Sequence, residues 1–128
     1  MRLLLDTHLL LWAATAPERL SRTARKLIGD PANQLHFSVV SLWEIIIKSA
    51  SGRSDLSIDA HALRLGLVAS DYRELEIKGS HALAVAALPD RHKDPFDHML
   101  IAQATAEGMT LLTSDKAVAD YPGPVRKV

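Results

Sequence analysis

Residues 93–104 read Lys-Asp-Pro-Phe-Asp-His-Met-Leu-Ile-Ala-Gln-Ala, and this stretch predicts a helix with an acidic side chain at the edge of the core. Asp94 is typical of an N-cap, and Pro95 fits the first helical position because its missing N–H removes only a donor without an intrahelical partner. Asp97 then lies in the first turn, where the helix dipole favours a carboxylate. The residues three, four and seven positions further on are apolar, so Asp97 shares the helix face that contacts the core. A carboxylate in this place needs a partner, which can be a basic residue, a backbone amide or a metal ion.

Short apolar or β-branched runs alternate with helical segments along the rest of the chain. Ser41 and Glu44 have the spacing of a capping box, which predicts a helix that begins at Ser41. The alternation of strands and helices predicts an α/β sandwich with a mostly parallel sheet. The expected strands are residues 2–5, 35–40, 74–77 and 109–113, with another beginning at Val125.

Length and composition narrow the protein class. With 128 residues, 48% hydrophobic and 23% charged, residues 1–128 are expected to form one folded domain. The absence of cysteine excludes disulfides and thiolate-bound zinc, so a bound metal would need oxygen or imidazole ligands. No apolar run approaches the length of a membrane span or resembles a signal peptide. A cytoplasmic protein without membrane contact is therefore expected.

The formal net charge is zero, with 15 basic and 15 acidic residues. This balance excludes a uniformly basic nucleic-acid-binding surface, although local patches remain open. The candidate patches are Lys48 with Arg53, Arg91 with Lys93, and Arg126 with Lys127.

Four carboxylates are expected at the edge of the sheet where the strands end. Asp6 follows the first strand directly, and Asp115 follows the 109–113 strand after one serine. Glu44 and Asp97 are each expected in the first turn of a helix whose N-terminus faces that edge. Each acid alone also has a structural explanation as a helix cap, a turn former or a partner of the helix dipole.

The four acids together favour a metal site. One pair of carboxylates at about 4 Å separation already repels by roughly 4 kcal/mol at an effective dielectric near 20. The sequence places no lysine or arginine beside all of them, whereas Mg²⁺ or Mn²⁺ would neutralise the cluster. The neighbouring hydroxyls of Thr7, Ser41 and Thr113 could orient the acids, although helix capping also explains them. His8, His92 and His98 lie near the acids in the sequence, but no pair of them has ligand spacing.

Four segments, taken in order, resemble the successive motifs of PIN-domain ribonucleases, and most closely the VapC-type toxins of prokaryotic toxin–antitoxin pairs. The resemblance covers nearly the whole chain, and its strength comes from the order of the motifs. They are Leu3-Leu4-Leu5-Asp6-Thr7-His8, Ser38-Val39-Val40-Ser41-Leu42-Trp43-Glu44-Ile45, Asp94-Pro95-Phe96-Asp97 and Leu111-Leu112-Thr113-Ser114-Asp115.

The resemblance implies a three-layer α/β/α fold and a Mg²⁺- or Mn²⁺-dependent endoribonuclease that acts as a toxin. It also implies an RNA substrate, a homodimer and a cognate antitoxin that blocks the site. The residues that match the acidic quartet of this family are Asp6, Glu44, Asp97 and Asp115, with Asp94 in a supporting role. Core packing explains the apolar runs at 63–68 and 81–88, either of which could also contribute to a dimer or antitoxin interface.

Two other functions remain open from the residues. The first is a phosphoryl-transfer or receiver-like domain with Asp6 as the nucleophile, which is disfavoured because no second acid stands beside Asp6 in the sequence. The second is a non-catalytic module that binds RNA or protein on the same fold, which the presence of all four acids disfavours.

Overall fold

A five-stranded parallel sheet forms the middle of the protein. The computed structural model describes residues 1–52, 57–90 and 94–128. The strands are ordered β3-β2-β1-β4-β5, and every neighbouring pair is parallel. They are β1 (Arg2–Leu5), β2 (Gln34–Ser38), β3 (Arg73–Leu75), β4 (Thr110–Thr113) and β5 (Val125–Lys127). The predicted α/β fold with a parallel sheet is confirmed.

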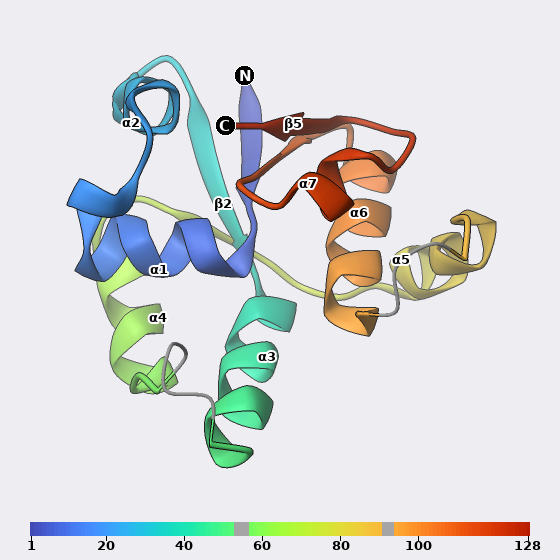
Figure 1. Ribbon diagram of the computed structural model, residues 1–128, viewed down its shortest axis with the longest axis horizontal. Helices are drawn as coiled ribbons and strands as arrows, with labels where there is room; N and C mark the ends of the chain where they lie inside the picture. Colours follow the sequence, from blue (N-terminus) through green and yellow to red (C-terminus); the bar gives the residue numbers. More distant parts are fainter. Residues whose placement is uncertain (53–56, 91–93) are drawn as a thin grey trace.

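Helices cover both faces of this sheet (Figure 1). The α-helices are α1 (Thr7–Thr15), α2 (Arg22–Gly29), α3 (Val39–Ala50), α4 (Ala60–Ala69), α5 (Gly79–Ala84), α6 (Pro95–Glu107) and α7 (Lys116–Ala119). The described residues also form the short 3₁₀ helices η1 (Pro17–Arg19) and η3 (Val85–Ala87).

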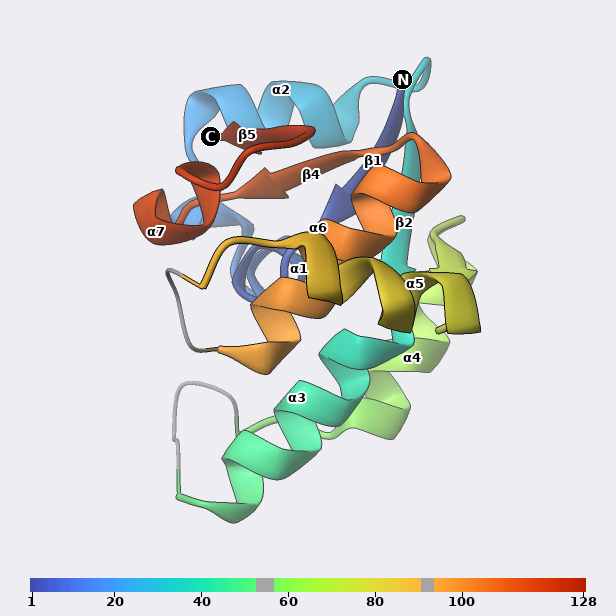
Figure 2. The ribbon, with the colours of Figure 1, turned by 90° about the vertical axis from the view of Figure 1, so that its right-hand side faces the viewer.

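The central strand β1 divides the core into two halves. Leu3 and Leu5 lie in a cluster that includes buried residues of α1, α2 and α4, whereas Leu4 lies in a second cluster with buried residues of α6. Successive side chains of a strand point to opposite faces, which explains this division. Figure 2 shows α6 in front of β1, with α5 against α6 and α1 behind. The outcome is the expected three-layer arrangement.

The start of α3 differs from the prediction. Strand β2 ends at Ser38, and the helix begins at Val39, so Ser41 is not its N-cap. The hydroxyl of Ser38 accepts a hydrogen bond from the N–H of Val40 at 3.0 Å and donates one to Gln103 Oε1 at 2.6 Å. The expected strand was therefore too long, because two β-branched valines were assigned to it. Glu44 lies in the second turn of α3 and does not form a capping box.

A buried polar network connects α5 and α6 to the start of α3. His81 is fully buried; its Nδ1 accepts a hydrogen bond from the N–H of Lys78 at 3.1 Å, and its Nε2 lies 2.9 Å from Glu107 Oε2. The backbone donor at Nδ1 places the ring proton on Nε2, so Nε2 donates to Glu107. Gln103 Nε2 lies 3.4 Å from His81 Nδ1, and the amide oxygen of Gln103 holds Ser38. The network therefore determines where the helix that carries Glu44 begins.

Two elements differ slightly in their bounds from the prediction. The helix expected at 81–88 begins earlier, at Gly79, and ends at Ala84, where η3 continues it. The strand expected at 74–77 is β3, at residues 73–75. Among the described residues, every helix is too short or too polar to cross a lipid bilayer.

Candidate active site

Asp6 caps α1 at the carboxyl end of β1. Its side chain is buried, with 6% exposure; Oδ1 accepts a hydrogen bond from the N–H of Leu9 at 3.0 Å, and Oδ2 accepts one from the hydroxyl of Thr113. Burial raises the pKa of Asp6 above its ordinary value, and the hydrogen bonds from Thr113 and Leu9 oppose this effect. Asp6 is therefore an N-cap and also a buried acid held in a defined orientation.

Thr113 connects the ends of the two central strands. Its fully buried hydroxyl donates to Asp6 and accepts a hydrogen bond from the N–H of Asp115 at 3.0 Å. Asp115 in turn caps α7, because its Oδ1 accepts from the N–H of Ala117 at 2.8 Å. One threonine thus positions two acids that are far apart in the sequence.

Glu44 projects from the second turn of α3 and is almost fully buried, with 3% exposure. The hydroxyl of Thr7 donates to Glu44 Oε1 and lies 3.0 Å from the hydroxyl of Ser41. Ser41 therefore supports this acid from within α3, and its role differs from the predicted helix cap. The second carboxylate oxygen, Oε2, accepts from Lys48 Nζ at 2.5 Å.

Lys48, which the sequence offers as part of a candidate basic patch, lies in the cavity between two acids. Its Nζ also lies 3.0 Å from Asp94 Oδ2, and it lies 5.5 Å from the centre of the Phe96 ring. Burial acts to lower the pKa of Lys48, but the hydrogen bonds and charges of Glu44 and Asp94 raise it above its ordinary value. Burial acts to raise the pKa of Asp94, and the hydrogen bond and charge of Lys48 lower it overall.

The start of α6 agrees with the prediction. Asp94 is its N-cap, with Oδ1 accepting from the N–H groups of Phe96 at 2.9 Å and Asp97 at 3.4 Å. Pro95 is the first helical residue, and Asp97 is the acid of the first turn. Asp97 is half-buried and lines the cavity described next.

The carboxyl edge of the sheet holds a polar cavity of about 200 Å³. All four predicted acids line it, and so do the supporting residues Asp94 and Thr7. Two predicted hydroxyls do not line it: Thr113 donates to Asp6, and Ser41 contacts Thr7, which donates to Glu44. The cavity is lined by Asp6, Thr7, His8, Glu44, Lys48, Asp94, Asp97, Ser114 and Asp115.

The donor set fits a hard divalent cation, since it consists of carboxylate oxygens supported by hydroxyls. Across residues 1–52, 57–90 and 94–128, however, no three acidic or histidine side chains are placed closely enough to hold an ion as they are arranged. The contacts explain this, because Asp6 and Glu44 are each engaged with partners inside the protein. By their chemistry these residues fit a metal ion. When an ion binds, some of these hydrogen bonds would have to exchange for contacts with it.

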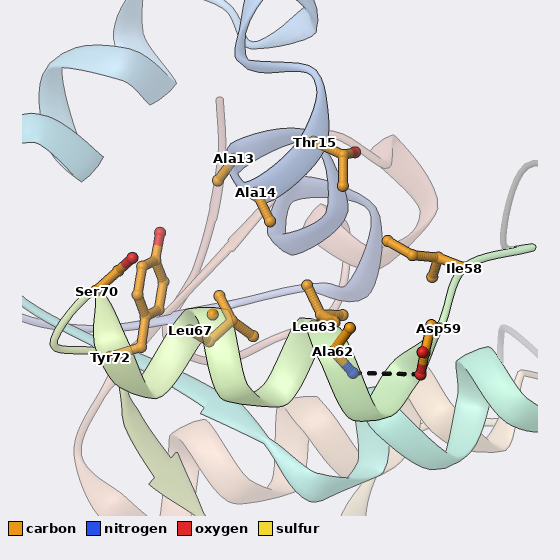
Figure 3. Close-up of a pocket in the computed structure, with 11 residues that line it drawn as sticks. Ala13, Ala14, Thr15, Ile58, Asp59, Ala62, Leu63, Leu67, Ser70 and Tyr72 are labelled. Atoms are coloured by element: carbon orange, nitrogen blue, oxygen red, sulfur yellow. Dashed lines mark hydrogen bonds between the residues drawn. The ribbon is translucent and has the colours of Figure 1, made fainter.

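A larger hollow of about 380 Å³ lies between the end of α1 and α4 (Figure 3). Small and apolar side chains form most of its wall. Among the described residues that line it, Asp59 is the one carboxylate, and it caps α4 by accepting from the N–H groups of His61 and Ala62. The smaller cavity gathers the acids, so it is the candidate active site.

Comparison with known families identifies the fold. The family model described as PIN domain matches residues 3–124. The chain belongs to the PIN-domain family. Ribonuclease VapC22 of Mycobacterium tuberculosis (strain ATCC 25618 / H37Rv) is 30% identical over 122 residues, which cover 94% of this chain and 92% of that protein.

Solved structures with the same PIN fold come from toxin–antitoxin complexes. VapBC2 from Rickettsia felis, bound to a promoter DNA fragment, matches with a TM-score of 0.71 and 15% identity, covering 99% of this chain and 98% of that chain. VapBC from Salmonella typhimurium, also bound to DNA, matches with a TM-score of 0.69, 15% identity and the same coverage. VapBC-5 from Mycobacterium tuberculosis matches with a TM-score of 0.60 and 20% identity over 99% of this chain and 97% of that chain.

Sequence reasoning missed two contributors to the cavity of this PIN domain. Lys48 follows Glu44 by four residues on one helix, a spacing that places two side chains on the same face and could have indicated the pair. His8 was not counted among the predicted metal ligands. It lines the cavity, and the centre of its ring lies 6.1 Å from the centre of the Trp12 ring. The predicted patch residues Arg53, Arg91 and Lys93, together with His92, lie outside the described residues.

Proposed function

We propose that this PIN domain is a divalent-metal-dependent endoribonuclease that acts as the toxin of a toxin–antitoxin pair. The observation that carries the proposal is the gathering of Asp6, Glu44, Asp97 and Asp115 around one cavity at the carboxyl edge of the sheet. The similarity to Ribonuclease VapC22 supports RNA as the substrate.

Under this proposal the four acids would hold Mg²⁺ or Mn²⁺. Such an ion activates water and neutralises charge on the attacking and leaving oxygens of a phosphodiester. Thr113 keeps Asp6 oriented toward the cavity, and Thr7 does the same for Glu44. Asp94 holds the start of α6 and with it the position of Asp97. The chain thus supplies oriented oxygen ligands and a cavity with room for a few water molecules.

Metal removal tests this function directly. We expect the purified protein to cleave a structured RNA with Mg²⁺ or Mn²⁺ and to lose that activity with excess chelator, because hydrolysis requires the carboxylate-held ion. Asp97→Asn, measured beside it, should be inactive under all three conditions. Cleavage that persists with chelator, or in the variant, would contradict the proposal and would point to a contaminating or metal-independent nuclease.

The two other functions have less support in the geometry. Both oxygens of Asp6 accept hydrogen bonds and the side chain is 6% exposed, which does not suit a nucleophile that must attack a phosphoryl donor. A non-catalytic binding module would not require four acids around one cavity, and the cleavage assay separates it from an enzyme.

We also propose a cognate antitoxin as the protein partner. The structural neighbours support this partner because their chains come from VapBC toxin–antitoxin complexes. Residues 63–68, predicted as core with a possible interface role, include Leu65 and Val68, which are exposed on α4, whereas Leu63 and Leu67 of the same helix line the hollow in Figure 3. An apolar segment of an antitoxin could pack against such a surface.

A homodimer is the proposed state of the isolated chain. Exposed apolar side chains on α3 and α5 support it, since Trp43 and Ile46 are each 56% exposed and Leu83 is 79% exposed. Exposed apolar side chains that gather into one larger patch mark protein interfaces. A C₂ dimer is the commonest way to bury it.

Light scattering tests this assembly. We expect the unmodified chain to have a mass of about 28 kDa, twice its 14.0 kDa, and Leu83→Asp to shift it toward the monomer, because a charge would be buried unpaired in the interface. Arg22→Asp on exposed α2 serves as the control and should remain dimeric. A monomeric unmodified chain would contradict the proposed homodimer.

A further inference from the structure

Glu44 has both of its carboxylate oxygens engaged inside the protein. Oε1 accepts from the hydroxyl of Thr7, and Oε2 accepts from Lys48 Nζ at 2.5 Å. A metal ion that takes Glu44 as a ligand therefore has to share these oxygens with the hydroxyl of Thr7 or with the ammonium of Lys48, and two cations on one carboxylate repel each other. Thr7 and Glu44 are 3% exposed, whereas the Lys48 side chain is 18% exposed and flexible, so the lysine contact is the one that can exchange.

Lys48 is held in this place by two helices. It lies four residues after Glu44 on α3, which brings the two side chains to one face. Asp94, the N-cap of α6, approaches from the other side and lies 3.0 Å from the same Nζ. Phe96 lies 5.5 Å from the ammonium, at a separation where the face of a ring attracts a cation. The ammonium therefore stands between two acids of a cavity that the proposed function assigns to a metal ion.

We propose that Lys48 is a built-in counter-ion of the acidic cavity, and that it competes with the divalent cation for Glu44. The inference rests on the proposed metal-dependent function and adds a regulation of metal affinity to it. In the metal-free protein the ammonium neutralises Glu44 and Asp94. Metal binding then brings a second cation to Glu44, which repels the ammonium of Lys48, so this lysine raises the metal concentration at which the site fills.

The competition determines the direction of the mutational effect. Without the ammonium, the metal-free protein keeps a buried carboxylate without its cation and two acids that repel each other. The metal-bound protein loses less, because the ion itself neutralises the acids and is no longer repelled by a neighbouring positive charge. The difference between the two states appears as tighter metal binding.

Calorimetric titration with Mn²⁺ alone tests the inference on the full chain. We expect Lys48→Met to bind Mn²⁺ about tenfold more tightly than the unmodified protein, within the range typical of coupling between two binding events. Lys48→Arg keeps the charge and should bind like the unmodified protein. Thermal unfolding provides a second readout that does not depend on activity: Lys48→Met should melt lower with chelator and gain more from added Mn²⁺.

A matched control separates this effect from the general loss of a lysine. Lys78 also faces a carboxylate, with its Nζ 3.8 Å from Glu107, but it lies outside the acidic cavity. Lys78→Met should leave Mn²⁺ affinity unchanged. If Lys48→Met does not fold in chelator, Lys48→Gln replaces it, because the amide keeps a hydrogen-bond donor and removes only the charge.

The outcomes distinguish this inference from the function on which it rests. Unchanged or weaker Mn²⁺ affinity in the charge-removing variants, with normal binding by the unmodified chain, would overturn the competition and leave metal dependence intact. An unmodified chain that does not bind Mn²⁺ would overturn the metal-dependent function, and the competition with it.

Discussion

Asp6→Asn is expected to lower RNA cleavage at least about 100-fold, which exceeds the 10- to 100-fold loss typical for a residue that only orients a metal ligand. Asp6 is the most central of the four acids, because β1 is the middle strand, between β2, which leads into the helix of Glu44, and β4, which leads to Asp115. An amide cannot supply the negative charge that holds the cation. Initial rates at saturating Mg²⁺ measure the effect.

The same variant should be at least as stable as the unmodified protein when no metal is present. Asparagine is also a good N-cap, so the hydrogen bond from the N–H of Leu9 can be kept. Burial raises the folded pKa of Asp6 above the unfolded value of 3.8, so the ionised form disfavours folding. This cost is absent below pH 3.8 and grows as the pH rises through the folded pKa. The stability advantage of Asp6→Asn should therefore increase from acid to neutral pH.

Asp59→Asn provides the matched control for both the cleavage measurement and the stability measurement. Asp59 is also an N-cap aspartate, on α4, and it does not line the acidic cavity. Its variant should cleave RNA normally, and its thermal stability should change little because asparagine is also a good N-cap. Loss of folding in Asp6→Asn would contradict the expected gain in stability, because asparagine keeps the helix cap, and retained cleavage would remove Asp6 from the proposed metal ligands.

Thr113→Val is expected to lower metal affinity or cleavage about 10- to 100-fold and to cost about 1–3 kcal/mol of unfolding free energy. Valine has nearly the same shape but cannot donate to Asp6 or accept from the N–H of Asp115. Two polar groups of the cavity would then lose their partner, and Asp6 would lose the contact that orients it. Mn²⁺ titration and urea unfolding measure the two effects.

Two further variants separate the hydroxyl from the packing. Thr113→Ser keeps the donor and acceptor and should recover most of the affinity. Thr105→Val removes a threonine hydroxyl that donates to the carbonyl of Ile101 within α6, and it should leave Mn²⁺ affinity unchanged. Full affinity in Thr113→Val would show that the strand ends hold Asp6 without this hydroxyl.

Much of the fold and most of the site could be predicted because the decisive interactions are local. The caps Asp94, Asp59 and Ser21 each accept from an N–H within three residues, so their patterns are visible in the sequence. The position of Asp6 after β1 and of Asp115 after β4 follows from the rule that parallel strands end at one edge. Membership of the PIN-domain family agrees with the order of these motifs.

The start of α3 could not be predicted in this way. Ser38 and Ser41 are both plausible caps, and the local pattern favours Ser41 because Glu44 follows it at capping-box spacing. The structure selects Ser38, whose hydroxyl also reaches Gln103, 65 residues away in the sequence. A tertiary hydrogen bond thus overrides the local preference and places Glu44 one turn further into the helix.

Short segments of the chain encode the acidic residues, their order and the strand ends beside which they lie, since periodicity, capping and strand direction act over a few residues. The partners that those acids meet across the fold are not encoded in short segments. Lys48 meets Asp94 across 46 residues, and Thr113 meets Asp6 across 107, because α3 packs against α6 and β4 pairs with β1. Charge neutralisation inside the cavity therefore depends on the packing of whole elements, which no local pattern specifies.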